Sequence, residues 1–435
     1  MKSILTVFLL ALFIIATSFF SKEKSNTVVP MTENATDTWG FFSHKLINRC
    51  AVFTLPEVML PLFKPNIEYI TEQAVAPDKR RFMVANEGFR HYINLDRWAF
   101  LPQDKLEAQI LHTDIFLINE RGDTTLLIDY ASIRKLKRDY YLKAKTIKKL
   151  FGRDSIVVSD STFRRFFITN MSRIQPDENM SISIDSIAQY FKKEGLILRG
   201  PFRSAFAKDK LTATGILPYH LIALQRQLTD AFIAKDKNRI LKLAAELGHY
   251  IADAHVPLHT ISNYDGQLTN QNGVHAFWES RLPELFAKNQ YDFFVGRSEY
   301  FDNPKKYYWN IIAASNKLVA KTLRVEKEVA AAFRDDNKYC PETVNRTTIQ
   351  KPCFDFSESY HERLDGMVED RMRDAILAVG SAWYTAWVDA GQPDLEIFRM
   401  GPLSKTDSIK IDSAELAADK LLKNGGKMIG RHEEY

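Results

Sequence analysis

Apolar residues recur at three- and four-residue steps along most of the chain after Trp39, which is the spacing of amphipathic helices. Over residues 218–255 this pattern predicts two helices, broken near Lys235 and Asp236. Pro257 predicts the end of the second helix, because a proline disfavours the helical conformation in the residue before it. The same spacing predicts helical segments over 275–286, 305–333 and 360–391. We therefore expect an all-α fold of many helices.

One region departs from the helical pattern. The stretch IFLINERGDTTLLIDY has two apolar runs around a polar turn, which is typical of a β-hairpin, and it predicts a small mixed or β-containing insertion at about 115–201. A basic run from Arg134 to Arg153 follows the hairpin. We interpret this run as the solvated face of an amphipathic helix. The alternative is contact with phosphates or an anionic membrane, with Tyr140 and Tyr141 stacking or inserting.

The two ends of the chain differ from its middle. Lys2 and the uncharged apolar run from Ile4 to Phe20 predict a secretory signal peptide, or a membrane anchor if the segment is not cleaved. We therefore expect a secreted or periplasmic protein, membrane-anchored in the second case. The predicted organisation is a signal peptide or anchor at 1–21, a flexible lead-in at 22–38, the main domain at 39–400 and a polar tail at 401–435.

The amino-acid composition excludes few classes of fold or binding partner. The net charge of +5, from 59 basic and 54 acidic residues, does not by itself indicate a nucleic-acid or membrane partner. The three cysteines exclude a disulfide-dense scaffold. Cys340 and Cys353 could close a loop in an oxidising compartment, and Cys50, in an apolar stretch, is expected to be a buried free thiol.

Candidate chemistry is concentrated between His249 and Glu279. His249 and Asp253 are four residues apart, as are His275 and Glu279, so on a helix each pair lies on one face and can bind one cation. His259 lies between the two pairs. Polar residues on solvated helix faces would explain one such pair, but not two pairs with a further histidine between them. The cluster therefore predicts a metal site.

The donor types indicate the metal. Imidazole together with carboxylate is typical of zinc and iron sites, whereas calcium and magnesium sites are dominated by oxygen ligands. A structural zinc site is usually closed by four cysteine or histidine ligands, but this cluster contains no cysteine. We therefore expect zinc, in a site that leaves positions open for water and substrate.

Three earlier motifs extend the pattern toward the N-terminus. Trp39 to His44 read WGFFSH, Asp78 lies in APDKRR, and His91 lies in RHYINLD. In this order, followed by the cluster, they resemble a superfamily that comprises bacterial zinc-dependent phospholipase C and the fungal and plant single-strand-specific zinc nucleases. The resemblance rests on nine positions in the same order, and it implies a multi-helix domain around a central metal cluster.

The resemblance implies two to three zinc ions. It assigns one ion to Asp78, His91, His249 and Asp253, a second to His259, His275 and Glu279, and a third to His44, Asp253 and the backbone of Trp39. In the family the tryptophan is the mature N-terminus, so a signal cut near Ser18 would leave the third site dependent on a second cleavage before Trp39. Asp78 and Asp253 are the predicted catalytic residues, Asp78 as a proton acceptor and Asp253 as a ligand that bridges two ions.

The function that the resemblance implies is that of an exported zinc-dependent hydrolase of phosphodiester bonds, phospholipase C-like, that uses metal-activated hydroxide without a covalent enzyme intermediate. Glu279 as the last ligand, and the short loop from His259 to His275, favour the phospholipase branch. The expected substrate is a phospholipid, with single-stranded nucleic acid as the alternative. We also expect peripheral membrane contact and predict no protein partner. A further hypothesis is an exported metal-binding protein without catalytic activity.

Overall fold

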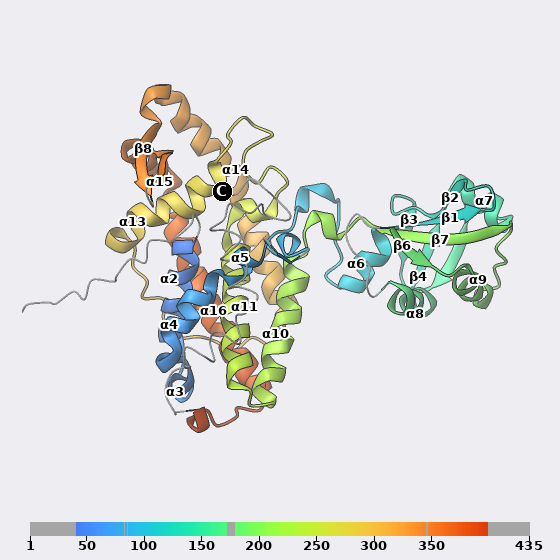
Figure 1. The fold of residues 1–435 in the computed structure, drawn as a ribbon, viewed down its shortest axis with the longest axis horizontal. Helices are drawn as coiled ribbons and strands as arrows, with labels where there is room; N and C mark the ends of the chain where they lie inside the picture. Colours follow the sequence, from blue (N-terminus) through green and yellow to red (C-terminus); the bar gives the residue numbers. More distant parts are fainter. Residues whose placement is uncertain (1–40, 82, 85, 172–178, 345–346, 399–435) are drawn as a thin grey trace, which may run out of the picture. The chain divides into compact units, whose positions relative to one another are not determined.

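The computed structural model describes residues 41–81, 83–84, 86–171, 179–344 and 347–398 (Figure 1). Trp39, the predicted signal peptide and lead-in, and the predicted tail therefore lie outside the described residues. The helices of the main part are α2 (Phe41–Ala51), α3 (Leu60–Phe63), α4 (Ile67–Glu72), α5 (Ala76–Arg80), α6 (Lys105–Leu111), α10 (Leu217–Ile233), α11 (Lys237–His255), α12 (Val274–Ala276), α13 (Leu282–Gln290), α14 (Pro304–Ala332), α15 (Phe354–Leu364) and α16 (Met367–Asp389).

The two helices predicted over 218–255 are confirmed as α10 and α11. The break between them falls at Lys235, whose φ of 53° is left-handed, and Asp236 caps α11 by accepting a hydrogen bond from the backbone N–H of Arg239. The helix α11 ends at His255, two residues before Pro257. Local sequence therefore sets both ends of the helix that carries His249 and Asp253.

The helix α11 lies at the centre of the main hydrophobic core. Its residues from Ala244 to His255 are all buried, and α2, α10, α14 and α16 pack against it (Figure 1). The indole N–H of Trp383, on α16, donates to the carbonyl of Ala244. Burial on all sides means that polar side chains on α11 need partners within the protein, because water cannot solvate them.

The expectation of a single long helical segment over 360–391 is wrong in one respect. Asp365 and Gly366 both have positive φ, and they separate α15 from α16. The segment 275–286 is helical but is not one continuous α-helix, because a π-helical turn over Phe277–Arg281 lies between α12 and α13.

The prediction of an all-α fold is wrong. The described residues contain three antiparallel sheets with strand orders β2-β1-β7-β6, β3-β4-β5 and β8-β9, so the fold is mixed α/β. The insertion comprises β1 (Thr113–Asn119), β2 (Thr124–Ile128), β3 (Ile133–Leu136), β4 (Asp139–Leu142), α7 (Lys145–Phe151), β5 (Ile156–Ser159), α8 (Asp160–Asn170), β6 (Asn179–Ile182), α9 (Ile184–Lys193) and β7 (Phe202–Asp209). The predicted hairpin is confirmed as β1 and β2.

The strands β8 (Tyr339–Val344) and β9 (Thr347–Pro352) form a hairpin that the sequence pattern did not indicate. They contain few apolar residues, so hydrophobic alternation could not mark them. The disulfide between Cys340 and Cys353 closes this hairpin, and Cys50 is a half-buried free thiol.

The insertion has a hydrophobic core of its own, formed by residues between Ile110 and Ala207. The basic run does not form one helix face, because it is divided among β3, β4 and α7. Tyr140 is fully buried and stacks on Phe163, so it is not available to insert into a partner, whereas Tyr141 is only half-buried.

Within the described part of the chain, no single helix combines the length and apolar character needed to cross a bilayer. Two consecutive helical stretches, Phe41–Thr54 and Glu57–Arg80, together have the required length and composition, but the chain bends by 118° between them.

Candidate metal centre

Eight of the nine predicted site residues are described, and the fold brings all eight together. They come from six segments: α2 supplies His44, α5 supplies Asp78, the turn after Arg90 supplies His91, α11 supplies His249 and Asp253, the turn Pro257–Thr260 supplies His259, and the helical segment from Val274 to Arg281 supplies His275 and Glu279. Each of these side chains is at most 8 % exposed. The ninth, Trp39, lies outside the described residues.

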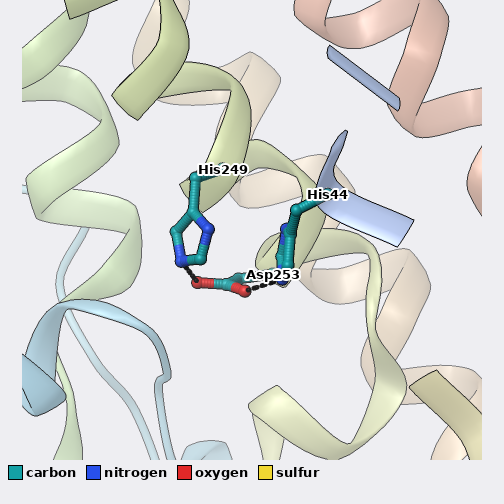
Figure 2. A group of neighbouring side chains, drawn as sticks. All are labelled: His44, His249 and Asp253. Atoms are coloured by element: carbon teal, nitrogen blue, oxygen red, sulfur yellow. Dashed lines mark ion pairs between the residues drawn. The ribbon is translucent and has the colours of Figure 1, made fainter. Parts of the chain in front are cut away.

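The carboxylate of Asp253 lies between His249 and His44, as Figure 2 shows. Its Oδ2 is 3.3 Å from Nε2 of His249, and its Oδ1 is 3.5 Å from Nε2 of His44. The imidazole rings of the two histidines are 4.2 Å apart between centroids. The three donor groups therefore face a common point.

A second group joins this one at His249. The donor atoms of Asp78, His91 and His249 lie within 4.8 Å of one another, and Nε2 of His249 is 3.0 Å from Nδ1 of His91. The Oδ2 of Asp253 is also 3.0 Å from Nδ1 of His91. All four residues that the resemblance assigns to one ion therefore converge.

The third group is formed by His259, His275 and Glu279, the three residues that the resemblance assigns to a second ion. The Oε2 of Glu279 is 2.8 Å from Nε2 of His275 and 3.3 Å from Nε2 of His259. Its other oxygen, Oε1, is 3.1 Å from Nε2 of His44. Glu279 lies in the π-helical turn, a local feature that frequently occurs at functional sites.

Backbone carbonyls orient two of the imidazoles. The Nδ1 of His249 lies 2.8 Å from the carbonyl oxygen of Ala74, and the Nδ1 of His275 lies 3.3 Å from that of Tyr264. Since a carbonyl can only accept, Nδ1 is protonated in both rings, so Nε2 is the nitrogen that could bind a metal. Both histidines thus turn Nε2 toward the site.

Burial governs the protonation of the cluster. It lowers the pKa of His249, and together with the nearby guanidinium of Arg81 it lowers the pKa of His91 well below its usual value. Both rings are therefore neutral and able to bind a cation. Burial raises the pKa of Asp253 to about 8, although the neighbouring His259 and His44 oppose this shift.

Glu279 differs from Asp253. Burial alone would raise its pKa, but hydrogen bonds with His259, His275 and His44 outweigh burial and hold the pKa of Glu279 well below its usual value. The two carboxylates of the centre therefore shift in opposite directions, because histidine contacts dominate at Glu279 and burial dominates at Asp253.

Sequence reasoning missed several buried charged residues that support the centre. Arg81 is 1 % exposed, and its Nη1 is 3.6 Å from Oδ1 of Asp78, three residues earlier. Glu87 is fully buried four residues before His91. The available signal was the spacing: Arg81 is three residues after Asp78, and Glu87 is four residues before His91. Without the tertiary structure, both residues are interpreted as part of a solvated charged stretch.

A cavity adjoins the centre beside His44 and Glu279. Its walls include Val256, Val368 and Met372. Arg371 and Ser43 also line this cavity, so its wall combines apolar and polar side chains.

Taken together, these buried histidine and carboxylate groups could hold a metal ion. The facing nitrogens of His91 and His249 are 3.0 Å apart, and oxygens of Asp253 and Asp78 lie 3.0–3.7 Å from them, which fits a cation that binds several lone pairs at once. A comparison with protein-family models and a search of curated proteins both found no match to this chain, so the superfamily resemblance stays a prediction.

Proposed function

We propose that this chain is an exported zinc-dependent phosphodiester hydrolase of the phospholipase C type. The observation that carries the proposal is the convergence of eight buried histidine, aspartate and glutamate side chains from six separate segments. Burial of so many donors is costly unless a cation or hydrogen bonds satisfy them, and a structural zinc site would need only four.

The eight side chains would hold two to three zinc ions. Asp78, His91, His249 and Asp253 would bind one ion, and His259, His275 and Glu279 would bind another. His44 lies between the carboxylates of Asp253 and Glu279, and it would complete a third position. When bound, zinc ions lower the pKa of water toward neutrality and neutralise the charge of a phosphodiester.

The protein's own groups would position and deprotonate the attacking water. Asp78 is the proposed proton acceptor, because its Oδ1 lies at the edge of the cluster, 3.7 Å from Nε2 of His249. Arg81 lies beside the same oxygen, 3.6 Å away, and would help to hold the Asp78 carboxylate in place. Since the donors would hold zinc ions that activate water, we propose direct attack by water without a covalent enzyme intermediate.

A phospholipid is the proposed substrate. Val256, Val368 and Met372 line a small cavity of about 20 Å³ beside His44 and Glu279, so apolar side chains adjoin the proposed phosphate position, but an acyl chain would lie outside this cavity. Glu279 as the last donor and the short loop from His259 to His275 favour the same branch.

The test is an assay of the purified protein on phosphatidylcholine vesicles and on single-stranded DNA and RNA, with and without chelator. We expect diacylglycerol release that the chelator abolishes and zinc restores. The variant His275→Gln should lose this activity, whereas His361→Gln, a half-buried histidine that contacts Tyr291, should retain it. Release of nucleotides alone would identify a nuclease, and zinc content without hydrolysis would identify a metal-binding protein without catalytic activity.

A further inference from the structure

Glu87 is a fully buried carboxylate behind the metal centre. Its Oε2 is 2.7 Å from Nη1 of Arg90, and its Oε1 is 3.4 Å from Nη2 of Arg80 and accepts a hydrogen bond from the hydroxyl of Tyr250. Such a group is costly to bury unless it is fully hydrogen-bonded, and these contacts with Arg80, Arg90 and Tyr250 satisfy it.

The partners of Glu87 belong to the segments that carry metal-site residues. Arg80 is on α5, two residues after Asp78, and Tyr250 is on α11, directly after His249. Glu87 and Arg90 flank the turn that ends at His91. The Glu87 carboxylate thus connects α5, α11 and the turn that ends at His91, and each of these segments supplies a donor to the metal centre.

His91 is the donor that Glu87 can influence. Its Nδ1 faces Asp253 and His249, while its Nε2 is buried and forms no hydrogen bond among the described residues. The Oε1 of Glu87 is 4.0 Å from this Nε2. When Nδ1 binds a cation, the ring proton must be on Nε2, which points toward the carboxylate.

We propose that Glu87 is a positioning residue for His91: it fixes the ring with Nε2 protonated, so that Nδ1 is the metal donor. The negative charge of Glu87, 4.0 Å from Nε2, favours the proton on that nitrogen. A carboxylate behind a metal-binding imidazole orients the ring and raises its basicity. The inference rests on the proposed metal site, but not on the identity of the substrate.

The experiment compares the metal affinity of two matched variants. Glu87→Gln keeps the shape of the side chain and removes its charge. Glu246→Gln removes a carboxylate from the same network, since Oε1 of Glu246 is 2.6 Å from Nη1 of Arg80, but Glu246 has no contact with His91 among the contacts of the described residues. Binding of zinc is measured by competition with a chromophoric chelator, and the visible spectrum of the cobalt(II)-loaded protein reports on the ligands.

We expect Glu87→Gln to weaken zinc binding at one position by about 10- to 100-fold and to alter the cobalt(II) spectrum, with Glu246→Gln close to wild type in both. In a His91→Gln background, Glu87→Gln should cause no further loss. Wild-type affinity in Glu87→Gln, or equal losses in both glutamate variants, would overturn the proposal.

Two measures keep the outcome interpretable. If Glu87→Gln does not fold, as judged by circular dichroism, Glu87→Asp keeps the charge opposite Arg80 and Arg90 but withdraws the carboxylate from His91. It should then show the same loss of zinc affinity, and unchanged affinity would contradict the role. If the wild-type protein binds zinc but hydrolyses no phosphodiester, the proposed function fails, while the affinity comparison still decides the role of Glu87.

Discussion

The Nε2 of His249 lies 3.3 Å from the Oδ2 of Asp253, one helical turn further along α11 (Figure 2). The other oxygen of Asp253 faces His44, on α2. A single carboxylate therefore links donors from two helices that are about 200 residues apart in sequence. This position allows Asp253 to bridge donors from both helices.

The variant Asp253→Asn should lower hydrolysis by about 100-fold or more and reduce the zinc bound per chain, because an amide of the same shape cannot neutralise two cations. Zinc content and activity are measured on the same preparation. Asp374→Asn is the control, since Asp374 is an exposed acid on α16 that pairs with Arg371. A zinc content equal to wild type in Asp253→Asn would contradict the bridging role.

Removal of metal should destabilise the protein. A cation that binds only the folded state stabilises it by about 2.7 kcal/mol at a free concentration one hundred times its Kd. We expect the melting temperature to rise with added zinc and to fall with chelator. Scanning calorimetry over a zinc titration is the measurement, and a melting temperature that does not respond to zinc would count against the site.

Gly248 permits the close packing of α11 against α2. A Cβ at this position would lie 2.0 Å from Oδ1 of Asn48, whose Nδ2 donates to the carbonyl of Ala245. We expect Gly248→Ala to lower the free energy of unfolding by about 1–3 kcal/mol, as overpacking usually does. Urea denaturation measures the effect. The double variant with Asn48→Ala should lose less than the sum of the two single variants, and strict additivity would argue against the clash.

The disulfide between Cys340 and Cys353 should stabilise the hairpin β8–β9. Arg281, in the π-helical turn that carries Glu279, donates from Nε to the carbonyl of Pro352 at 3.0 Å. Replacing both cysteines with serine should lower the free energy of unfolding by about 3 kcal/mol. We expect zinc content to be retained, because the turn is also held by the main core. Loss of zinc on reduction would show instead that the hairpin maintains the site.

Acid should destabilise the protein through buried histidines, and His220 offers a test outside the proposed ligands. Burial lowers its pKa well below 6.5, and the nearby Arg90, Arg80 and Lys105 add to the shift. The folded state therefore keeps the ring neutral, while the unfolded chain takes up a proton near pH 6.5. The stabilisation is complete above this pH and is lost as the pH falls toward the folded-state pKa, by at most about 1.4 kcal/mol per pH unit.

The measurement is urea denaturation in chelator between about pH 7.5 and pH 5.5, for the wild type and for His220→Gln. The variant should lose less stability on acidification than the wild type. Identical losses would mean that the His220 ring takes up a proton in the folded state as readily as in the unfolded chain, contrary to its packing against Tyr250.

Local sequence was sufficient for the elements whose signals are local. The spacing of apolar residues, the Lys235–Asp236 break and Pro257 predicted α10 and α11, and the polar turn between two apolar runs predicted β1 and β2. The four-residue spacings in the cluster predicted the pairs His249 with Asp253 and His275 with Glu279. These features depend on backbone conformation and helical periodicity, which neighbouring residues determine.

The tertiary structure decided what spacing could not. The three sheets contradict the all-α prediction. The polar strands β8 and β9 were not predicted, because they are stabilised by pairing and a disulfide rather than by an apolar face. The contact of His44 with Glu279 and the connection of Arg80, Glu87 and Tyr250 behind His91 arise between segments distant in sequence. Burial and charge at such contacts depend on how the segments pack, and no local pattern encodes them.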